Sequence, residues 1–218
     1  MPARDPSEKT KGELINAAVR LFREKGWNSV NIEDVVKEVG VTRGAFYHYF
    51  KSRNELVYLT LTQLLTDENP FLLAEKQESF NALEKIRFGM KLNFKTQLKV
   101  AQTSDIIETM DDPVVLKSYL HYCINVVAIY MERLIKEGMI DGSTPATYPK
   151  HTAHAALMLY NEHLNPTIFK MSEAEFAERL DFLEEFGVKM GVPVLDEELR
   201  EMLTLNYQIC KEKLRRLG

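Results

Sequence analysis

Residues 40–56 read GVTRGAFYHYFKSRNEL, and this segment predicts more local structure than any other part of the chain. Gly40 can end a helix, because glycine adopts the left-handed conformation of a C-terminal cap at little cost. Thr42 can then cap a short helix. Ser52 and Glu55 have the spacing of a capping box, which predicts that a longer helix begins there. The segment therefore predicts a short helix that lies between two capped turns.

Two further helices are predicted before this segment. The first ends at Gly26 and has an apolar face formed by Leu14, Ala17, Ala18, Leu21 and Phe22. The second begins at the N-cap residue Asn31 and has an apolar stripe formed by Ile32, Val35, Val36 and Val39. Two short helices that are joined by a tight, glycine-containing turn form a helix-turn-helix.

The short helix inside residues 40–56 is polar on one side. Arg43, Tyr47 and His48 share a face at helical spacing. Phe46 and Phe50 do not share that face, and we expect them to lie in the core. A helix whose outer face offers such side chains can enter the major groove of DNA and contact bases and phosphates. A three-helix bundle without a nucleic-acid role would show the same apolar periodicity, so the polar face is what favours DNA binding.

The N-terminal region, over about residues 10–58, resembles the signature of the TetR/AcrR family of repressors. The resemblance rests on Gly26-Trp27, Asn31-Ile32, Val35 and the uninterrupted run 40–56. It implies an all-α fold, in which a three-helix helix-turn-helix DNA-binding head is joined to a helical ligand-binding and dimerisation domain. It places the head at residues 1–58 and the regulatory domain at residues 59–218. It also implies a repressor of its own or a neighbouring operon.

The resemblance implies that seven residues of the head face DNA: Asn31, Thr42, Arg43, Gly44, Tyr47, His48 and Lys51. Arg43 is the candidate for reading a guanine edge, where a bidentate pair discriminates by about 1–3 kcal/mol. Gly44 is expected to let the helix backbone approach the duplex closely. The others are expected to contact phosphates, and His48 is also a candidate for a base contact.

The charge is distributed unevenly along the chain. The net charge is −4, yet residues 1–60 carry ten Lys or Arg against eight Asp or Glu, and the remainder carries 18 against 24. A small basic head on an acidic body suits DNA binding. The two cysteines, Cys123 and Cys210, fit a reducing cytoplasm. Neither a secretory signal nor an apolar run of the roughly 20 residues that span a membrane is expected.

The region after about residue 67 is expected to form helices near 79–101, 103–110, 114–137, 148–163, 172–190 and 196–216. The first three are expected to enclose a pocket for a small, largely apolar effector, lined by Phe88, Phe94, Met110, Tyr119, Tyr122, Cys123 and Tyr130. An aromatic stripe at helical spacing also fits plain core packing, and both interpretations stay open. The effector is expected to release the protein from its operator.

The resemblance implies a homodimer that is built by the helices near 148–163 and 172–190. The expected interface residues are Ala153, Ala156, Leu157, Tyr160, Phe176, Leu180 and Leu183. A dimer also follows from the expected function, because a palindromic operator in double-stranded DNA requires two heads at a fixed spacing. The helix at 196–216 comes after the usual pair, and it can either reinforce that interface or cover the core.

The sequence contains no P-loop, dinucleotide-binding glycine pattern, nucleophile elbow or zinc-protease motif. We therefore expect no enzyme, no catalytic residue, no cofactor and no metal. His121, Cys123, His151 and His154 are candidate metal ligands, but the histidines are better interpreted as solvated or capping residues. Three alternatives stay open: a DNA-binding structural or cell-division regulator that needs no ligand, an activator, and a helical enzyme.

Overall fold

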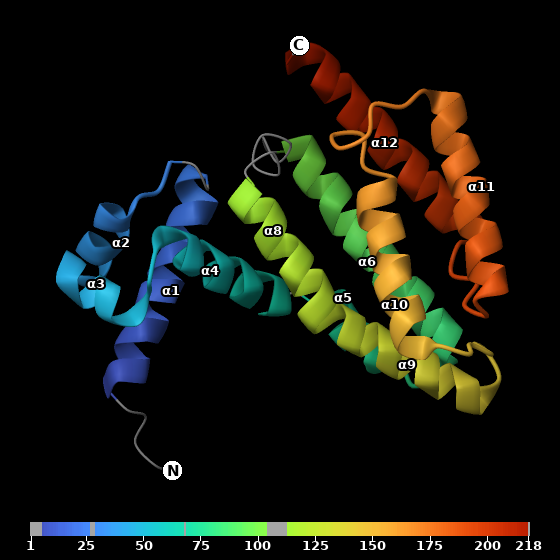
Figure 1. Cartoon of the computed structure of the whole chain (residues 1–218), viewed down its shortest axis with the longest axis horizontal. Helices are drawn as coiled ribbons and strands as arrows, with labels where there is room; N and C mark the ends of the chain where they lie inside the picture. The colour runs from blue at the N-terminus through green and yellow to red at the C-terminus, as the bar shows by residue number, and fades with distance from the viewer. Residues whose placement is uncertain (1–5, 27–28, 68, 104–112, 218) are drawn as a thin grey trace. The chain divides into compact units, whose positions relative to one another are not determined.

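The computed structural model describes residues 6–26, 29–67, 69–103 and 113–217. Every regular element within these ranges is a helix and none is a strand, so the predicted all-α fold is confirmed (Figure 1). The chain forms two units. The first unit contains the described residues up to 67 together with residues 113–120, and the second contains residues 69–103 and 121–217.

The first unit, called the head below, consists of α1 (Pro6–Lys25), α2 (Ile32–Val39), α3 (Arg43–Tyr49), α4 (Arg53–Asp67) and the start of α8 (Pro113–Tyr122). Helix α1 contacts both α2 and α4, and α2 contacts α3. Figure 1 shows α2 and α3 as two short helices joined by a tight turn. The predicted helix-turn-helix is therefore present.

Local capping residues set the helix boundaries in the head. Asn31 Oδ1 accepts the Asp34 amide at 2.9 Å, and the Asp34 carboxylate accepts the Asn31 amide at 3.0 Å, which starts α2 with a reciprocal capping box. Gly40 ends α2 with φ at 78°, in the left-handed region that side chains disfavour. The Thr42 side chain accepts the Ala45 amide at 3.1 Å and so starts α3.

The core of the head lies where α1 meets the other helices. Phe46 of α3 is 0% exposed and Phe50, which caps the C-terminus of α3, is 1% exposed, with ring centroids separated by 5.0 Å. They join a buried cluster that includes Leu14 of α1, Leu56 of α4 and Val115 of α8. These two rings anchor α3 to the core, while other side chains of the helix are exposed.

The second unit, called the body below, contains α5 (Pro70–Glu75), α6 (Ala82–Thr103), η1 (Cys123–Val127), α9 (Ala128–Asp141), α10 (Pro149–Met158), η2 (Leu159–His163), α11 (Glu173–Lys189) and α12 (Glu197–Leu217). Helix α6 contacts α5, α9 and α12, and α9 contacts α10 (Figure 1). The segments η1 and η2 are π-helical turns. Sequence reasoning missed both π-helical turns and the short helix α5.

The last helix, α12, covers the core of the body. Leu199 is 0% exposed and Leu203 is 3% exposed. The Tyr207 ring stacks on Phe176 with centroids 4.2 Å apart, and its hydroxyl donates to the carbonyl oxygen of Met171 at 2.9 Å. Of the two roles that the sequence left open for this helix, the structure shows coverage of the core.

By length and composition alone, the helical run Pro113–Asp141 could cross a membrane, since an 18-residue window in it has a mean hydropathy of 1.4. Core helices of soluble proteins pass the same test, and 39% of this window is buried inside the molecule. Met131, Leu134 and Ile135 are fully buried in the body. Packing within the protein therefore accounts for much of the apolar character of α9.

Asp196 links α6 to the start of α12. Its Oδ1 accepts the Leu199 amide at 2.9 Å, and its Oδ2 lies 2.8 Å from Lys91 Nζ. Partial burial by itself would raise the pKa of the Asp196 carboxyl, but these bonds and the charges of Lys91 and Arg87 lower that pKa below its ordinary value. The ionised carboxylate therefore stabilises the fold.

We expect Asp196→Asn to lower the free energy of unfolding by about 1 kcal/mol at neutral pH, because asparagine keeps the helix cap but loses the ion pairs. The contribution of the carboxylate is fully present above the ordinary Asp pKa of about 3.9, and it is lost as the pH falls through the lowered pKa. Urea unfolding of both proteins should therefore show a difference that shrinks below about pH 4. A difference that stays constant or grows in acid would contradict this role.

Candidate nucleic-acid interface

The outer face of α3 is a contiguous exposed surface that consists of Thr42, Arg43, Gly44, Tyr47 and His48. Lys51, which follows the helix, and Asn31, which precedes α2, are exposed as well. By contrast, Phe46 within α3 and Phe50 at its C-terminal cap are buried in the core of the head. The structure therefore places all seven sequence-predicted DNA contacts on the surface of the head.

Thr42 and Gly44 lie at the start of α3, and both are exposed to a ligand. The Thr42 hydroxyl accepts the Ala45 amide, which leaves its own proton for donation to a phosphate oxygen. A methyl group at Gly44 would have Thr42 Oγ1 as its nearest neighbour at 3.7 Å, so packing within the chain does not require glycine here. The missing side chain at Gly44 leaves the backbone of the first turn of α3 uncovered, and a close approach to a duplex would require this.

Arg43 is held on this face by two neighbours. Its Nη1 donates to Glu33 Oε1 of α2, and its Nη2 lies 3.4 Å from Tyr47 Oη. The guanidinium carbon is 5.8 Å from the centroid of the Tyr47 ring. The hydrogen bond to Tyr47 and the charge of Glu33 raise the pKa of Arg43 above its ordinary value, so the side chain is always a cation. Sequence reasoning missed Glu33, because only the packing of α2 on α3 brings it to Arg43.

The turns that flank α2 and α3 are tied to the start of α4. Arg53 Nε donates to the carbonyl oxygen of Val30 at 3.0 Å. The Lys51 amide donates to Glu55 Oε2 at 2.6 Å. These bonds fix the segments before α2 and after α3, so the fold itself orients the exposed face in advance of any ligand.

The predicted effector-pocket residues that the structure describes differ in burial. Phe94, Tyr122 and Cys123 are buried at 2–4% exposure. Phe88 and Tyr130 are half-buried. Burial, with smaller effects of Cys123 and Tyr130, raises the pKa of Tyr122, so its hydroxyl is neutral. Phe94, Tyr122 and Cys123 are therefore buried in the single chain, which both the pocket and the core interpretation allow.

Two other predicted pocket residues do not join this group. Tyr119 packs against the core of the head, and Met110 lies outside the described residues. A role of any of the seven in ligand binding stays a prediction. Within the described ranges, no three His, Cys, Asp or Glu side chains are grouped so that they could hold a metal ion.

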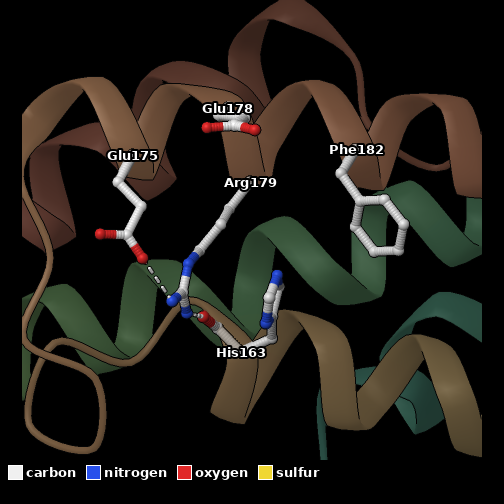
Figure 2. A pocket seen from close by; sticks show the side chains of 5 residues that line it. All are labelled: His163, Glu175, Glu178, Arg179 and Phe182. Atoms are coloured by element: carbon white, nitrogen blue, oxygen red, sulfur yellow. Dashed lines mark hydrogen bonds and ion pairs between the residues drawn. The ribbon is translucent and has the colours of Figure 1, made fainter.

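Figure 2 shows a hollow on the body that the sequence did not indicate, lined by His163, Glu175, Glu178, Arg179 and Phe182. Arg179 Nη2 donates to Glu175 at 2.7 Å, and its Nη1 donates to the carbonyl oxygen of His163. Burial and then the charge of Arg179 lower the pKa of His163, so the imidazole is neutral at pH 7. Two N–H donors of the Arg179 guanidinium therefore bind partners from the same chain.

The predicted dimer residues are all buried inside the single chain, at 0–5% exposure: Ala153, Ala156, Leu157, Tyr160, Phe176, Leu180 and Leu183. In the single chain these side chains therefore pack against other parts of the same chain, and their part in an interface stays a prediction. Other apolar side chains on α11 and just before or after it are 37–62% exposed: Ile168, Phe169, Phe182, Val188 and Met190. A role of α10 and α11 in a dimer stays a prediction.

Comparison with known proteins bears first on the head. A family model described as bacterial regulatory proteins, tetR family, matches residues 14–58. The Tn10 TetC protein of Escherichia coli is 34% identical over 79 residues, which cover 35% of this chain and 40% of that protein. The chain therefore spans less than half the length of this relative.

Solved structures extend the likeness to the body. The transcriptional repressor QsdR of R. erythropolis, from the TetR family, matches with a TM-score of 0.63 at 15% identity, over 88% of this chain and 100% of that one. RolR, solved in complex with the ligand resorcinol, matches with a TM-score of 0.61 at 15% identity, over 90% of this chain and 94% of that one. At such low identity these matches show a shared fold.

Proposed function

We propose that this chain, which belongs to the TetR family of bacterial regulatory proteins, is a homodimeric DNA-binding repressor of its own or a neighbouring operon. The observation that carries the proposal is the exposed outer face of α3, a helix that the buried Phe46 and Phe50 anchor to the core of the head. Arg43 and Tyr47 on this face can hydrogen-bond base edges and phosphates. A short helix that is anchored on one side and polar on the other fits the major groove.

A second copy of the chain would complete the DNA site. One short helix reads only a few base pairs, and a palindromic operator places two such helices about 34–36 Å apart, or a multiple of that distance. The exposed apolar residues on α11, Phe182 at 48% and Val188 at 62%, support a dimer that uses this helix, because exposed apolar patches mark interaction sites.

A small, largely apolar effector would release the dimer from its operator. It would do so by binding more tightly to a state in which the two heads no longer fit successive grooves, since equal affinity for both states shifts nothing. The support is the long aromatic-rich helical body and the resorcinol in the RolR structure. The protein would act in the cytoplasm, where the DNA is.

Capture of genomic DNA tests the proposal. The purified protein is incubated with sheared DNA from its source genome, and the retained fragments are sequenced beside those retained by an Arg43→Ala, Tyr47→Ala variant. We expect a few sharp peaks, each centred on a palindrome, that are absent for the variant. Diffuse retention, or the same peaks with the variant, would mean that α3 does not read sequence.

The effector is tested separately, on the captured operator. A panel of small aromatic compounds that includes resorcinol is screened for compounds that raise the melting temperature of the protein. Compounds that do so are then expected to weaken operator binding. If no compound that raises the melting temperature weakens operator binding, a regulator that needs no ligand becomes the better account.

A further inference from the structure

Glu33 lies beside the outer face of α3, and the function proposed above assigns it no role. It is the second residue of α2, and its side chain is 56% exposed. The cap of α2 is complete without it, because Asn31 and Asp34 satisfy each other's hydrogen bonds. The carboxylate of Glu33 forms an ion pair with Arg43 instead.

Helix stability does not explain this ion pair. Arg43 is the first residue of α3, where a positive charge opposes the helix dipole, and its side chain is 61% exposed. Exposed ion pairs contribute little to the free energy of folding. A carboxylate near a DNA-facing surface also repels phosphates and so weakens binding to any duplex. This loss of affinity would be offset if the ion pair made the protein discriminate better between its operator and other DNA.

The geometry holds the guanidinium of Arg43 from two directions. Glu33 accepts a hydrogen bond from Nη1, while the Tyr47 hydroxyl lies 3.4 Å from Nη2 and the Tyr47 ring packs against the same group. A guanidinium has five N–H donors, so these contacts leave donors for a base edge. A long side chain that is already held in one orientation loses less conformational freedom when it binds.

We propose that Glu33 is a positioning residue that orients Arg43 toward a guanine edge and repels phosphate contacts that carry no sequence information. The proposal rests on the DNA-binding function proposed above. Glu33 then lowers the affinity of the head for all DNA and raises the ratio of operator affinity to non-specific affinity. Specific interfaces commonly combine an attractive element with a repulsive one in this way.

The test measures the Kd of the captured operator and of a scrambled duplex of the same length, for the wild type, Glu33→Gln and Glu38→Gln. Glu38 is the matched control, because it lies on the same helix, pairs with Arg20 at 3.4 Å and carries the same charge. The two carboxylates are about 140° apart around the axis of α2. Both variants are expected to bind the scrambled duplex a few fold more tightly.

The ratio of operator affinity to non-specific affinity separates the two variants. It is expected to fall on the order of tenfold in Glu33→Gln and to stay unchanged in Glu38→Gln, because a bidentate guanine contact is lost only when Arg43 is misplaced. In an Arg43→Lys background, which keeps the charge but not the planar fork, Glu33→Gln should affect the ratio no more than Glu38→Gln does. Thermal unfolding of each variant checks that the head is folded.

The proposal is overturned if Glu33→Gln leaves the ratio unchanged or raises it, or if it lowers the ratio equally in the Arg43→Lys background. A wild-type ratio near one would overturn the proposed DNA-reading function, and the role of Glu33 with it. If the wild type has a high ratio of operator affinity to non-specific affinity, and Glu33→Gln and Glu38→Gln have the same effect on that ratio, only the role of Glu33 is overturned.

Discussion

Replacement of Phe46 by alanine is expected to lower the free energy of unfolding of the head by about 3–5 kcal/mol. Phe46 is fully buried, with its ring 5.0 Å from that of Phe50 and 5.3 Å from that of Tyr47. The substitution removes these apolar contacts and leaves a cavity beneath α3. Domains of this kind are stable by only about 5–15 kcal/mol, so the change removes a large share of the stability.

Urea unfolding followed by circular dichroism measures this loss, with His48→Ala as the control. His48 is exposed on the same helix, so its removal should change the free energy of unfolding by no more than about 0.5 kcal/mol. Phe46→Ala is also expected to lose DNA binding, because the buried side of α3 holds the exposed side in place. Equal effects of the two substitutions would mean that α3 is not anchored through Phe46.

Replacement of Arg43 by alanine is expected to weaken binding of the dimer to its operator by roughly 30-fold to 10⁴-fold. The estimate assumes that each head loses one bidentate guanine contact, worth about 1–3 kcal/mol, and that two heads act together. Affinity for a scrambled duplex should fall far less, because that complex loses no more than one phosphate contact for each head. Titration of both duplexes at one fixed salt concentration measures the two effects.

Arg20→Ala is the matched control for this prediction. It removes the same charge from an exposed side chain of the head, whose guanidinium lies 3.4 Å from Glu38. Arg20→Ala should therefore weaken operator and scrambled duplex by similar, small factors. If Arg43→Ala behaves in the same way, Arg43 contributes charge to DNA binding and does not read a base.

The helix boundaries of the head could be predicted because they depend on hydrogen bonds between residues close in sequence. Asn31 caps α2, and Gly40 ends it with a positive φ. Thr42 caps α3, and the Ser52 side chain accepts the Glu55 amide at 3.2 Å at the start of α4. Each of these signals acts within four residues, so it survives in the sequence alone.

Features that depend on how helices pack on one another could not be predicted in this way. The pair of Glu33 and Arg43 joins two helices, and no periodicity within either helix marks it. Phe176 was assigned to a dimer, but the Tyr207 ring of α12 covers it within the chain. An apolar stripe has the same spacing whether it faces its own chain, a partner or a ligand, so the spacing alone does not assign a residue to the core, an interface or a pocket.

The central claim is that the outer face of α3 reads base edges in the major groove, and methylation of guanine N7 by dimethyl sulfate tests it most directly, because N7 lies in that groove. The captured operator is methylated with wild-type protein and with Arg43→Ala, at protein concentrations that saturate the DNA. The account predicts a protected guanine in each half-site, with the half-sites about 10 base pairs apart or a multiple of that, and no such protection with Arg43→Ala. Unprotected guanines in the wild-type complex, or protection that Arg43→Ala leaves unchanged, would contradict it.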